Sequence, residues 1–132
     1  MTIGFICGAF DLLHPGHLVA LRDCKDNCDH LIVGLQVDPN LDRPNKHKPI
    51  ESIFERYIRL NACKYVDQII PYETDADLLN LLKTIRADVR FLDEGYTVNP
   101  KFIIGEKCIP IFYIKRDHTW SSTALRDKLR KK

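Results

Sequence analysis

Five apolar runs, separated by amphipathic segments, set the pattern of this chain. The runs are 3-IGFIC-7, 31-LIVGLQV-37, 66-VDQII-70, 89-VRFL-92 and 109-IPIFYI-114. They are mostly continuous rather than alternating, which is typical of strands buried on both faces of a sheet. Helices are expected between and after them, over about 17–28, 52–63, 75–85, 99–105 and 121–130. This alternation predicts an α/β fold, a Rossmann-like doubly wound parallel five-stranded sheet with helices on both faces.

The composition is that of an ordinary globular protein and indicates one domain over residues 1–132, with 45% hydrophobic and 29% charged residues. The net charge of +2 gives no reason to expect nucleic acid or a membrane as a partner. The charge is unevenly placed, because seven Lys or Arg and two Asp lie from Lys115 onward. This basic end either attracts phosphate or forms a solvated helix face.

The chain starts without a basic leader and contains no apolar run long enough to span a bilayer, so we expect a cytoplasmic protein. Its five cysteines are then expected to be reduced thiols. Cys24, Cys28 and His30 look like a possible metal site. However, Leu21, Cys24 and Cys28 share one helical face, which favours small buried thiols. We therefore expect no metal bound by protein side chains alone.

Polar residues follow most of the predicted strands at the end where a parallel sheet binds its ligands. After the second run comes a polar loop, 38-DPNLDRPNKHKPIES-52, and loops of this length inside a domain are usually functional or disordered. The fourth run is followed by 93-DEGYT-97 and the fifth by 115-KRDHTWSST-123. Histidines, lysines, arginines and hydroxyls are thus predicted to converge at one end of the sheet.

The first run leads into 8-GAFDLLHPGHL-18, the most informative stretch of the sequence. Pro15 and Gly16 open a helix, where unpaired N–H groups and the helix dipole favour an anion. His14 and His17 lie three positions apart, so both imidazoles face the same way and can donate to phosphoryl oxygens. The alternative is one helix-capping histidine and one surface histidine. The preceding Gly-x-Phe-Asp at a strand-to-helix joint favours the anion site.

The segment 4-GFICGAFDLLHPGH-17 resembles the signature of the nucleotidyltransferase superfamily that carries a His-x-Gly-His motif. The likeness is greatest to the small cytidylyltransferases, above all the glycerol-3-phosphate cytidylyltransferases. It continues through 55-ERYIRLNACKYVDQIIPY-72, and ends in a looser match at 116-RDHTWSST-123.

The resemblance implies transfer of a nucleoside monophosphate from CTP to a phosphorylated small alcohol such as glycerol 3-phosphate, with release of pyrophosphate. The acceptor phosphate would attack the α-phosphorus in line, without a covalent enzyme intermediate. The protein would mainly position groups and neutralise charge. The resemblance also implies Mg²⁺ carried by the nucleotide phosphates, and a homodimer.

Roles for individual residues follow from the same resemblance. His14 and His17 would stabilise the α-phosphate in the transition state, and Lys46 or Lys48 would reach the α-phosphate or the acceptor. Asp11 is expected to brace the turn rather than act as a base. Arg56 would hold a phosphate, and Arg116, Ser121 and Ser122 the β- and γ-phosphates. The other expected nucleotide-binding residues are Gly8, Ala9, Phe10, Asp93 and Trp120, and the acceptor side would include Asp38 together with Arg56.

Several positions depart from the family pattern. Asp117 replaces a threonine, and Thr119-Trp120 replaces Gly-Ile, so Trp120 either packs as a core or lid aromatic or stacks beside the base. The lysine loop is one residue longer, which leaves Lys46 and Lys48 as alternatives. Since similar sugar-phosphate adenylyltransferases have a stretch comparable to 93-DEGYT-97, ATP acting on a sugar phosphate or cofactor precursor is the first alternative. A non-catalytic nucleotide-binding module is the second.

Overall fold

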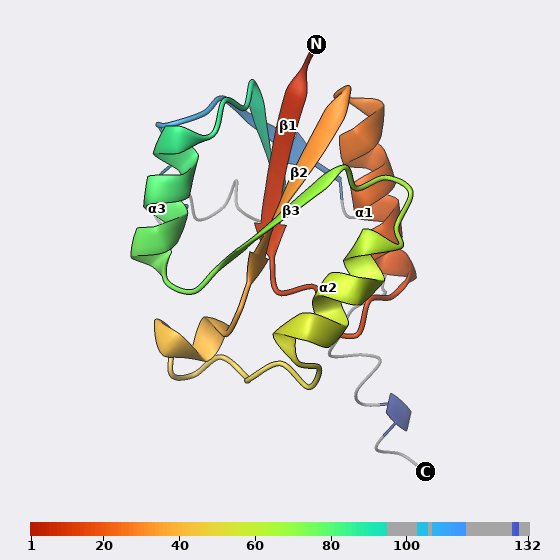
Figure 1. Ribbon diagram of the computed structural model, residues 1–132, viewed down its shortest axis with the longest axis vertical. Helices are drawn as coiled ribbons and strands as arrows, with labels where there is room; N and C mark the ends of the chain where they lie inside the picture. The colour runs from red at the N-terminus through yellow and green to blue at the C-terminus, as the bar shows by residue number, and fades with distance from the viewer. Residues whose placement is uncertain (95–102, 106, 116–127, 130–132) are drawn as a thin grey trace.

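In the computed structural model, five parallel strands form one sheet between two layers of helices (Figure 1). The strands are β1 (Ile3–Gly8), β2 (His30–Gln36), β3 (Gln68–Tyr72), β4 (Val89–Asp93) and β5 (Ile111–Ile114). The helices are α1 (Pro15–Asp26), α2 (Ile53–Asn61), α3 (Asp75–Thr84) and the short 3₁₀ helix η1 (Pro39–Leu41). The structure describes residues 1–94, 103–105, 107–115 and 128–129. The predicted Rossmann-like α/β fold is confirmed.

The strand order β3-β2-β1-β4-β5 places the change of direction between β1 and β4. The chain builds outward from β1 to β3 and then returns to the other side of β1. Gly4 pairs with Val89 across this junction, and the same register carried forward brings Gly8 level with Asp93. In open sheets of this kind, ligands bind outside the carboxyl ends of the strands at such a switch point. The stretch after β1 therefore begins where the fold favours a site.

Two apolar clusters hold the helices against the two faces of the sheet, with α1 and α2 on one face and α3 on the other (Figure 1). Leu21 and Cys24 of α1 and Leu60 of α2 pack into the first cluster. Leu78 and Leu82 of α3 pack into the second, around Phe5. Burial of β1 and β2 from both sides explains why their sequences are continuous apolar runs.

Several element boundaries differ from the prediction by one or two residues, and a side chain explains two of these shifts. β3 covers Gln68–Tyr72 rather than 66–70, because the carboxylate of Asp67 accepts the Leu31 N–H and thereby marks the start of the strand. α1 begins at Pro15 rather than at residue 17, because His14 caps it. Ile103–Gly105, the described part of the helix expected at 99–105, is not helical. The rest of that segment lies outside the described residues, as does all of 121–130 except Lys128 and Leu129.

All five cysteines are free thiols, and burial raises the pKa of Cys24. Within the part of the chain that the structure describes, no helix is long and apolar enough to cross a membrane.

Candidate active site

The candidate site lies at the carboxyl ends of the strands, where the loops after β1 and β2 meet (Figure 1). One loop runs from Ala9 to Leu13 and leads into α1. The other, residues 37–52, contains η1 and leads into α2. The first loop leads directly to His14, which caps α1, and to His17 in the first turn of α1, while the second loop holds both candidate lysines.

His14 and His17 together cap the N-terminus of α1. The Nδ1 atom of His14 accepts a hydrogen bond from the Gly16 N–H at 3.0 Å. The Nδ1 atom of His17 accepts one from the His14 N–H at 3.2 Å, which completes a capping box made of two imidazoles. Their ring centroids lie 3.9 Å apart with planes 31° from parallel, and the Phe10 ring centroid lies 5.4 Å from that of His17.

This cap fixes which ring nitrogen carries the proton. An Nδ1 atom that accepts a backbone hydrogen bond has no proton of its own, so each neutral ring is protonated on Nε2. The two imidazoles therefore present Nε2–H groups, the form that donates to a phosphoryl oxygen. Capping and anion binding, which the sequence posed as alternatives for His14, use different nitrogens of the same ring.

The structure corrects one expectation about this helix end. The prediction assigned anion binding partly to unpaired N–H groups of the first turn. Pro15 has no N–H, and the N–H of Gly16 is bonded to His14. The imidazoles take the place of those donors, so hydrogen bonds from this end of α1 to an anion depend on the histidine side chains.

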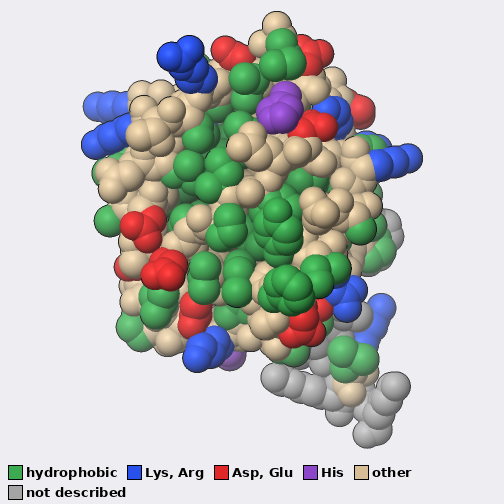
Figure 2. All heavy atoms as spheres, in the orientation of Figure 1, with side chains coloured by type: hydrophobic (Ala, Val, Ile, Leu, Met, Phe, Trp, Pro, Cys, Tyr) green, Lys and Arg blue, Asp and Glu red, His purple; other side chains and the backbone are tan. Residues whose placement is uncertain are grey.

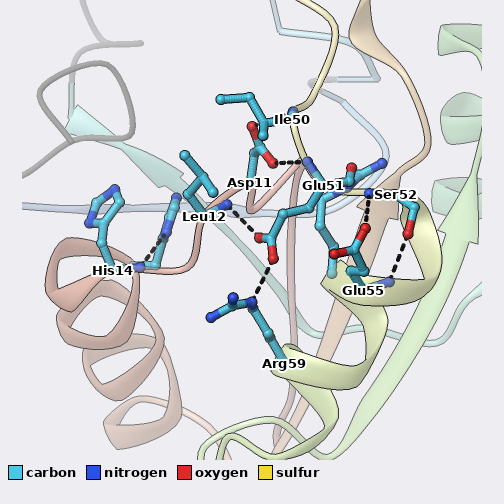
Figure 3. A network of polar contacts seen from close by, with 10 residues as sticks. Asp11, Leu12, His14, Ile50, Glu51, Ser52, Glu55 and Arg59 are labelled. Atoms are coloured by element: carbon cyan, nitrogen blue, oxygen red, sulfur yellow. Dashed lines mark hydrogen bonds and ion pairs between the residues drawn. The ribbon is translucent and has the colours of Figure 1, made fainter. Parts of the chain in front are cut away.

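The turn at Phe10–Leu12, just before His14, has an unfavourable backbone conformation. Hydrogen bonds with residues 50 and 51 stabilise it. Phe10 and Leu12 both have φ of 50°, a left-handed conformation that costs a residue other than glycine about 1–2 kcal/mol. Between them, the Asp11 carboxylate accepts the N–H groups of Ile50 and Glu51, each at 2.9 Å (Figure 3). Asp11 is 4% exposed, so its predicted role as a brace of this turn agrees with its contacts.

Arg56 does not have the position that the prediction required. Its side chain is 2% exposed, and its guanidinium donates to four backbone carbonyls at 2.5–3.1 Å, those of Ala9, Gln36, Val37 and Glu51. Burial lowers the pKa of Arg56, while the carboxylates of Asp11, Asp38 and Glu51 oppose this shift. With its donors bonded to the ends of β1 and β2, Arg56 is a buried brace rather than an available phosphate ligand.

The lysine loop contrasts with this brace, because its cations are exposed. The side chains of Lys46 and Lys48 make no hydrogen bond or ion pair with the described part of the chain. The loop itself is anchored, since Arg43 forms a two-point ion pair with Asp75 at 3.0 and 3.2 Å. Asn40 also donates to the carbonyl of Lys46. The loop thus presents its lysines from a fixed backbone.

The remaining described site residues support the strand ends. A Cβ on Gly8 would lie 3.2 Å from the Phe10 ring, so the small size of Gly8 serves the packing of Phe10. Asp38 caps η1 by accepting the Asn40 N–H at 2.9 Å, and Asp93 is the last residue of β4. Arg116, Trp120, Ser121 and Ser122, together with Asp117 and Thr119, lie outside the described residues.

Glu51 belongs to this site and was missed by the sequence analysis. Its carboxylate is buried and accepts the Leu12 N–H at 2.8 Å and Nε of Arg59 at 2.6 Å (Figure 3). The sequence holds one indirect signal, the capping box 52-SIFE-55 that starts α2 right after Glu51. That signal gives the helix start but not the contact with Leu12.

Within the described residues, no group of three or more His, Cys, Asp or Glu side chains could hold a metal ion. The described part of the site offers the exposed ammonium groups of Lys46 and Lys48 and the imidazoles of His14 and His17.

Comparison with known proteins identifies relatives of this chain. A profile of the cytidylyltransferase-like family matches residues 5–128. The bifunctional protein HldE of Caulobacter sp. (strain K31) is 36% identical over 99 residues, which cover 74% of this chain and 20% of the relative. The ethanolamine-phosphate cytidylyltransferase of Arabidopsis thaliana is 38% identical over 79 residues, or 57% of this chain and 19% of the relative. The chain spans about a fifth of the length of these curated relatives.

Solved structures show the same fold. The lipopolysaccharide core biosynthesis protein from Thermoplasma volcanium superposes with a TM-score of 0.69 at 23% identity, over 91% of this chain and 99% of that one. Pantothenate synthetase from Thermus thermophilus superposes with a TM-score of 0.69 at 11% identity, over 99% of this chain and 64% of that one.

Proposed function

Because the chain belongs to the cytidylyltransferase-like family, we propose that it transfers CMP from CTP to a phosphorylated small alcohol and releases pyrophosphate. An oxygen of the acceptor phosphate attacks the α-phosphorus of CTP. A new P–O bond forms to the acceptor as the bond to the pyrophosphate oxygen breaks. The reaction needs positioned donors and cations more than it needs a protein nucleophile.

The observation that carries this proposal is the pair of imidazoles at the start of α1. Both rings are held by their Nδ1 atoms, so two Nε2–H donors are oriented before any substrate arrives. They lie at the sheet's switch point and at the positive end of a 12-residue helix. Donors fixed in advance stabilise charge that develops on the α-phosphate without reorganising during the reaction.

The exposed lysines supply the second part of the proposal. Lys46 or Lys48 contacts the α-phosphate or the acceptor phosphate from the opposite loop. Mg²⁺ carried by the nucleotide would neutralise part of the charge on its phosphates. Arg116, Ser121 and Ser122 remain proposed ligands of the β- and γ-phosphates.

The first test measures pyrophosphate release with CTP and with ATP, each offered glycerol 3-phosphate, ethanolamine phosphate and a panel of sugar phosphates. Inorganic pyrophosphatase is present to drive the reaction forward. Turnover with CTP and a phosphorylated alcohol supports the proposal. Turnover with ATP alone would favour adenylyl transfer to a sugar phosphate or cofactor precursor. Nucleotide binding without turnover across the panel would favour a non-catalytic module.

His14→Asn separates catalysis from capping. Asparagine is among the best helix-capping residues and keeps an acceptor for the Gly16 N–H, but it has no counterpart of the Nε2–H donor. We expect the melting temperature to stay close to that of the unchanged protein while kcat falls by roughly 10² or more. Unchanged kcat would show that His14 only caps the helix.

A homodimer is part of the same proposal. Ile50, Phe54, Tyr57 and Ile58 are 61%, 69%, 37% and 53% exposed and lie at and along α2. Apolar side chains gather over the middle of the face in front of β3 and α2 (Figure 2). Exposed apolar patches of this kind often mark contacts between proteins. Light scattering should give twice the monomer mass, and Phe54→Lys with Ile58→Lys should return the monomer. A monomeric unchanged protein would contradict this part.

A further inference from the structure

We propose that Glu51 is a positioning residue that holds both site histidines in their donor geometry through the turn at Phe10–Leu12. The inference rests on the proposed nucleotidyl transfer for its kinetic test, but not for its spectroscopic one. Among the described contacts, Glu51 reaches the histidines through the backbone of Leu12 rather than through either imidazole.

The turn needs support because its own sequence does not favour its conformation. Phe10 and Leu12 are bulky residues at positive φ, where glycine or asparagine is usual. Both lie within four residues of His14, and the Phe10 ring packs against His17. A shift of this turn toward ordinary backbone angles would therefore move the cap of α1 and both rings.

The support is reciprocal and comes from a segment about forty positions later in the chain. The Asp11 carboxylate accepts the N–H of Glu51, and the Glu51 carboxylate accepts the N–H of Leu12 (Figure 3). Both carboxylates are buried, at 4% and 7% exposure, so these charge-assisted hydrogen bonds form where water competes little. The positive charges of Arg56 and Arg59 offset the negative charges of these two carboxylates.

The same contacts fix the two loops of the site relative to each other. Glu51 lies near the end of the loop that holds Lys46 and Lys48, and Leu12 lies in the loop that leads into His14 and α1. A phosphate that binds to both an imidazole and a lysine ammonium group requires the two loops to keep a fixed position relative to each other. A misplacement of about 1 Å in such a site can lower the rate 10²-fold.

Glu51→Ala removes the hydrogen bond to Leu12 and should lower kcat by roughly 10–100-fold, with KM for nucleotide and acceptor within about threefold. Long-range ¹H–¹⁵N spectra of the imidazoles supply a second readout without substrate. The unchanged protein should show His14 and His17 as Nε2–H tautomers. Glu51→Ala should show mixed tautomers at both rings, because the cap that fixes them has loosened.

Two control variants separate positioning from general destabilisation. Glu55→Ala removes another carboxylate that bonds to a backbone N–H, that of Ser52 at 3.0 Å, without touching the turn at Phe10–Leu12. It should keep kcat within about threefold and the tautomers unchanged. Arg59→Ala removes the exposed partner of Glu51 but leaves its contact with Leu12, so its effects on kcat and on the tautomers should be smaller than those of Glu51→Ala. Should Glu51→Ala not fold, Glu51→Asp takes its place, since it keeps the charge but is one methylene too short to reach Leu12.

Unchanged tautomers in the Glu51 variant, or a kcat no lower than in Glu55→Ala, would overturn the inference. Absence of turnover by the unchanged protein with either nucleotide would defeat the proposed function instead. In that case the tautomers alone decide on Glu51, and mixing confined to the Glu51 variant still supports its positioning role.

Discussion

Both ends of the sheet carry carboxylates that accept hydrogen bonds from backbone N–H groups, but these carboxylates are exposed at the amino ends and buried at the carboxyl ends. At the amino ends, an aspartate stands directly before each of three strands, Asp29 before β2, Asp67 before β3 and Asp88 before β4. Each accepts an N–H at the start of the neighbouring strand, from Thr2, Leu31 and Ile3 at 2.7–2.8 Å. The same contact, an aspartate carboxylate that accepts a backbone N–H of the neighbouring strand region, thus occurs three times.

At the carboxyl ends, the contacts are not repeated. Asp11, Glu51 and Arg56 are each less than 10% exposed and bond to backbone from different loops. They stabilise a turn with two left-handed residues rather than the start of a strand. Buried charges and backbone strain that serve no strand or helix directly are typical of functional sites. This contrast supports the proposal that the active site lies at the histidine end of the sheet.

The largest expected effect on stability comes from replacing Arg56, whose side chain braces the ends of β1 and β2. Arg56→Met leaves the carbonyls of Ala9, Gln36, Val37 and Glu51 without their donor and the nearby carboxylates without their cation. We expect the free energy of unfolding to fall by about 3–5 kcal/mol. Urea unfolding followed by circular dichroism measures it. Arg56→Lys should recover part of the loss, because one ammonium group cannot reach all four carbonyls. If Arg56→Met lowered the free energy of unfolding by less than about 1 kcal/mol, the contrast between the two ends of the sheet would not hold.

His17 is expected to affect the reaction more than the fold. His17→Ala should lower kcat by roughly 10² or more with modest change in nucleotide binding, and also weaken the cap of α1 by about 1 kcal/mol. His17→Asn keeps an acceptor for the His14 N–H, so it should recover the stability but not the rate. Steady-state kinetics and thermal unfolding of both variants separate the two roles. Recovery of kcat in His17→Asn would mean that His17 acts only as a cap.

Replacing Lys46 or Lys48 is expected to lower the rate less than replacing His17 does, and to leave the stability unchanged. Replacing Lys46 and Lys48 by alanine one at a time should lower kcat about tenfold or more in one variant and less than threefold in the other. Both side chains are exposed, so unfolding free energies should stay within about 0.5 kcal/mol. Lys83→Ala, in the last turn of α3, is the matched control and should change neither quantity. Equal small losses in both loop variants would exclude a catalytic lysine here.

The smallest effect is expected at the amino end. Burial would raise the pKa of Asp67, but hydrogen bonds from Lys25 and the Leu31 N–H outweigh it and leave the pKa below its ordinary value. A carboxylate with a lowered pKa stabilises the fold at neutral pH, and this contribution is lost as the pH falls through its folded-state pKa. Asp67→Asn should cost no more than about 1 kcal/mol at pH 7. The difference from the unchanged protein should shrink in acid.

A loss at pH 7 as large as that of Arg56→Met would contradict the comparison between the ends. Thermal unfolding of Asp67→Asn and the unchanged protein from pH 7 to pH 3 makes the measurement.

Much of the fold could be predicted because its signals are local. Continuous apolar runs identified all five strands, and the helices α1, α2 and α3 fell within or close to the expected segments. Boundaries shifted by two residues where a side chain decided them, at the His14 cap and at Asp67.

The site was predicted less completely, since an arginine in a helix looks the same whether it faces solvent or a strand end. Arg56 was expected to bind phosphate because its helix matched the family pattern, but the packing of α2 turns its side chain onto backbone carbonyls. Glu51 gave no signal of its own. Its contact with Leu12 joins residues 39 positions apart and exists only once both loops are folded.

The sequence by itself determined the sheet, the two histidines at a strand-to-helix joint and the lysines in a long loop, because these depend on periodicity and spacing along the chain. The tertiary structure decided which ring nitrogens donate, which arginine is buried and which carboxylate holds the strained turn. These depend on backbone N–H and carbonyl groups brought together from distant segments, and a buried polar group must find its partner wherever the fold places one.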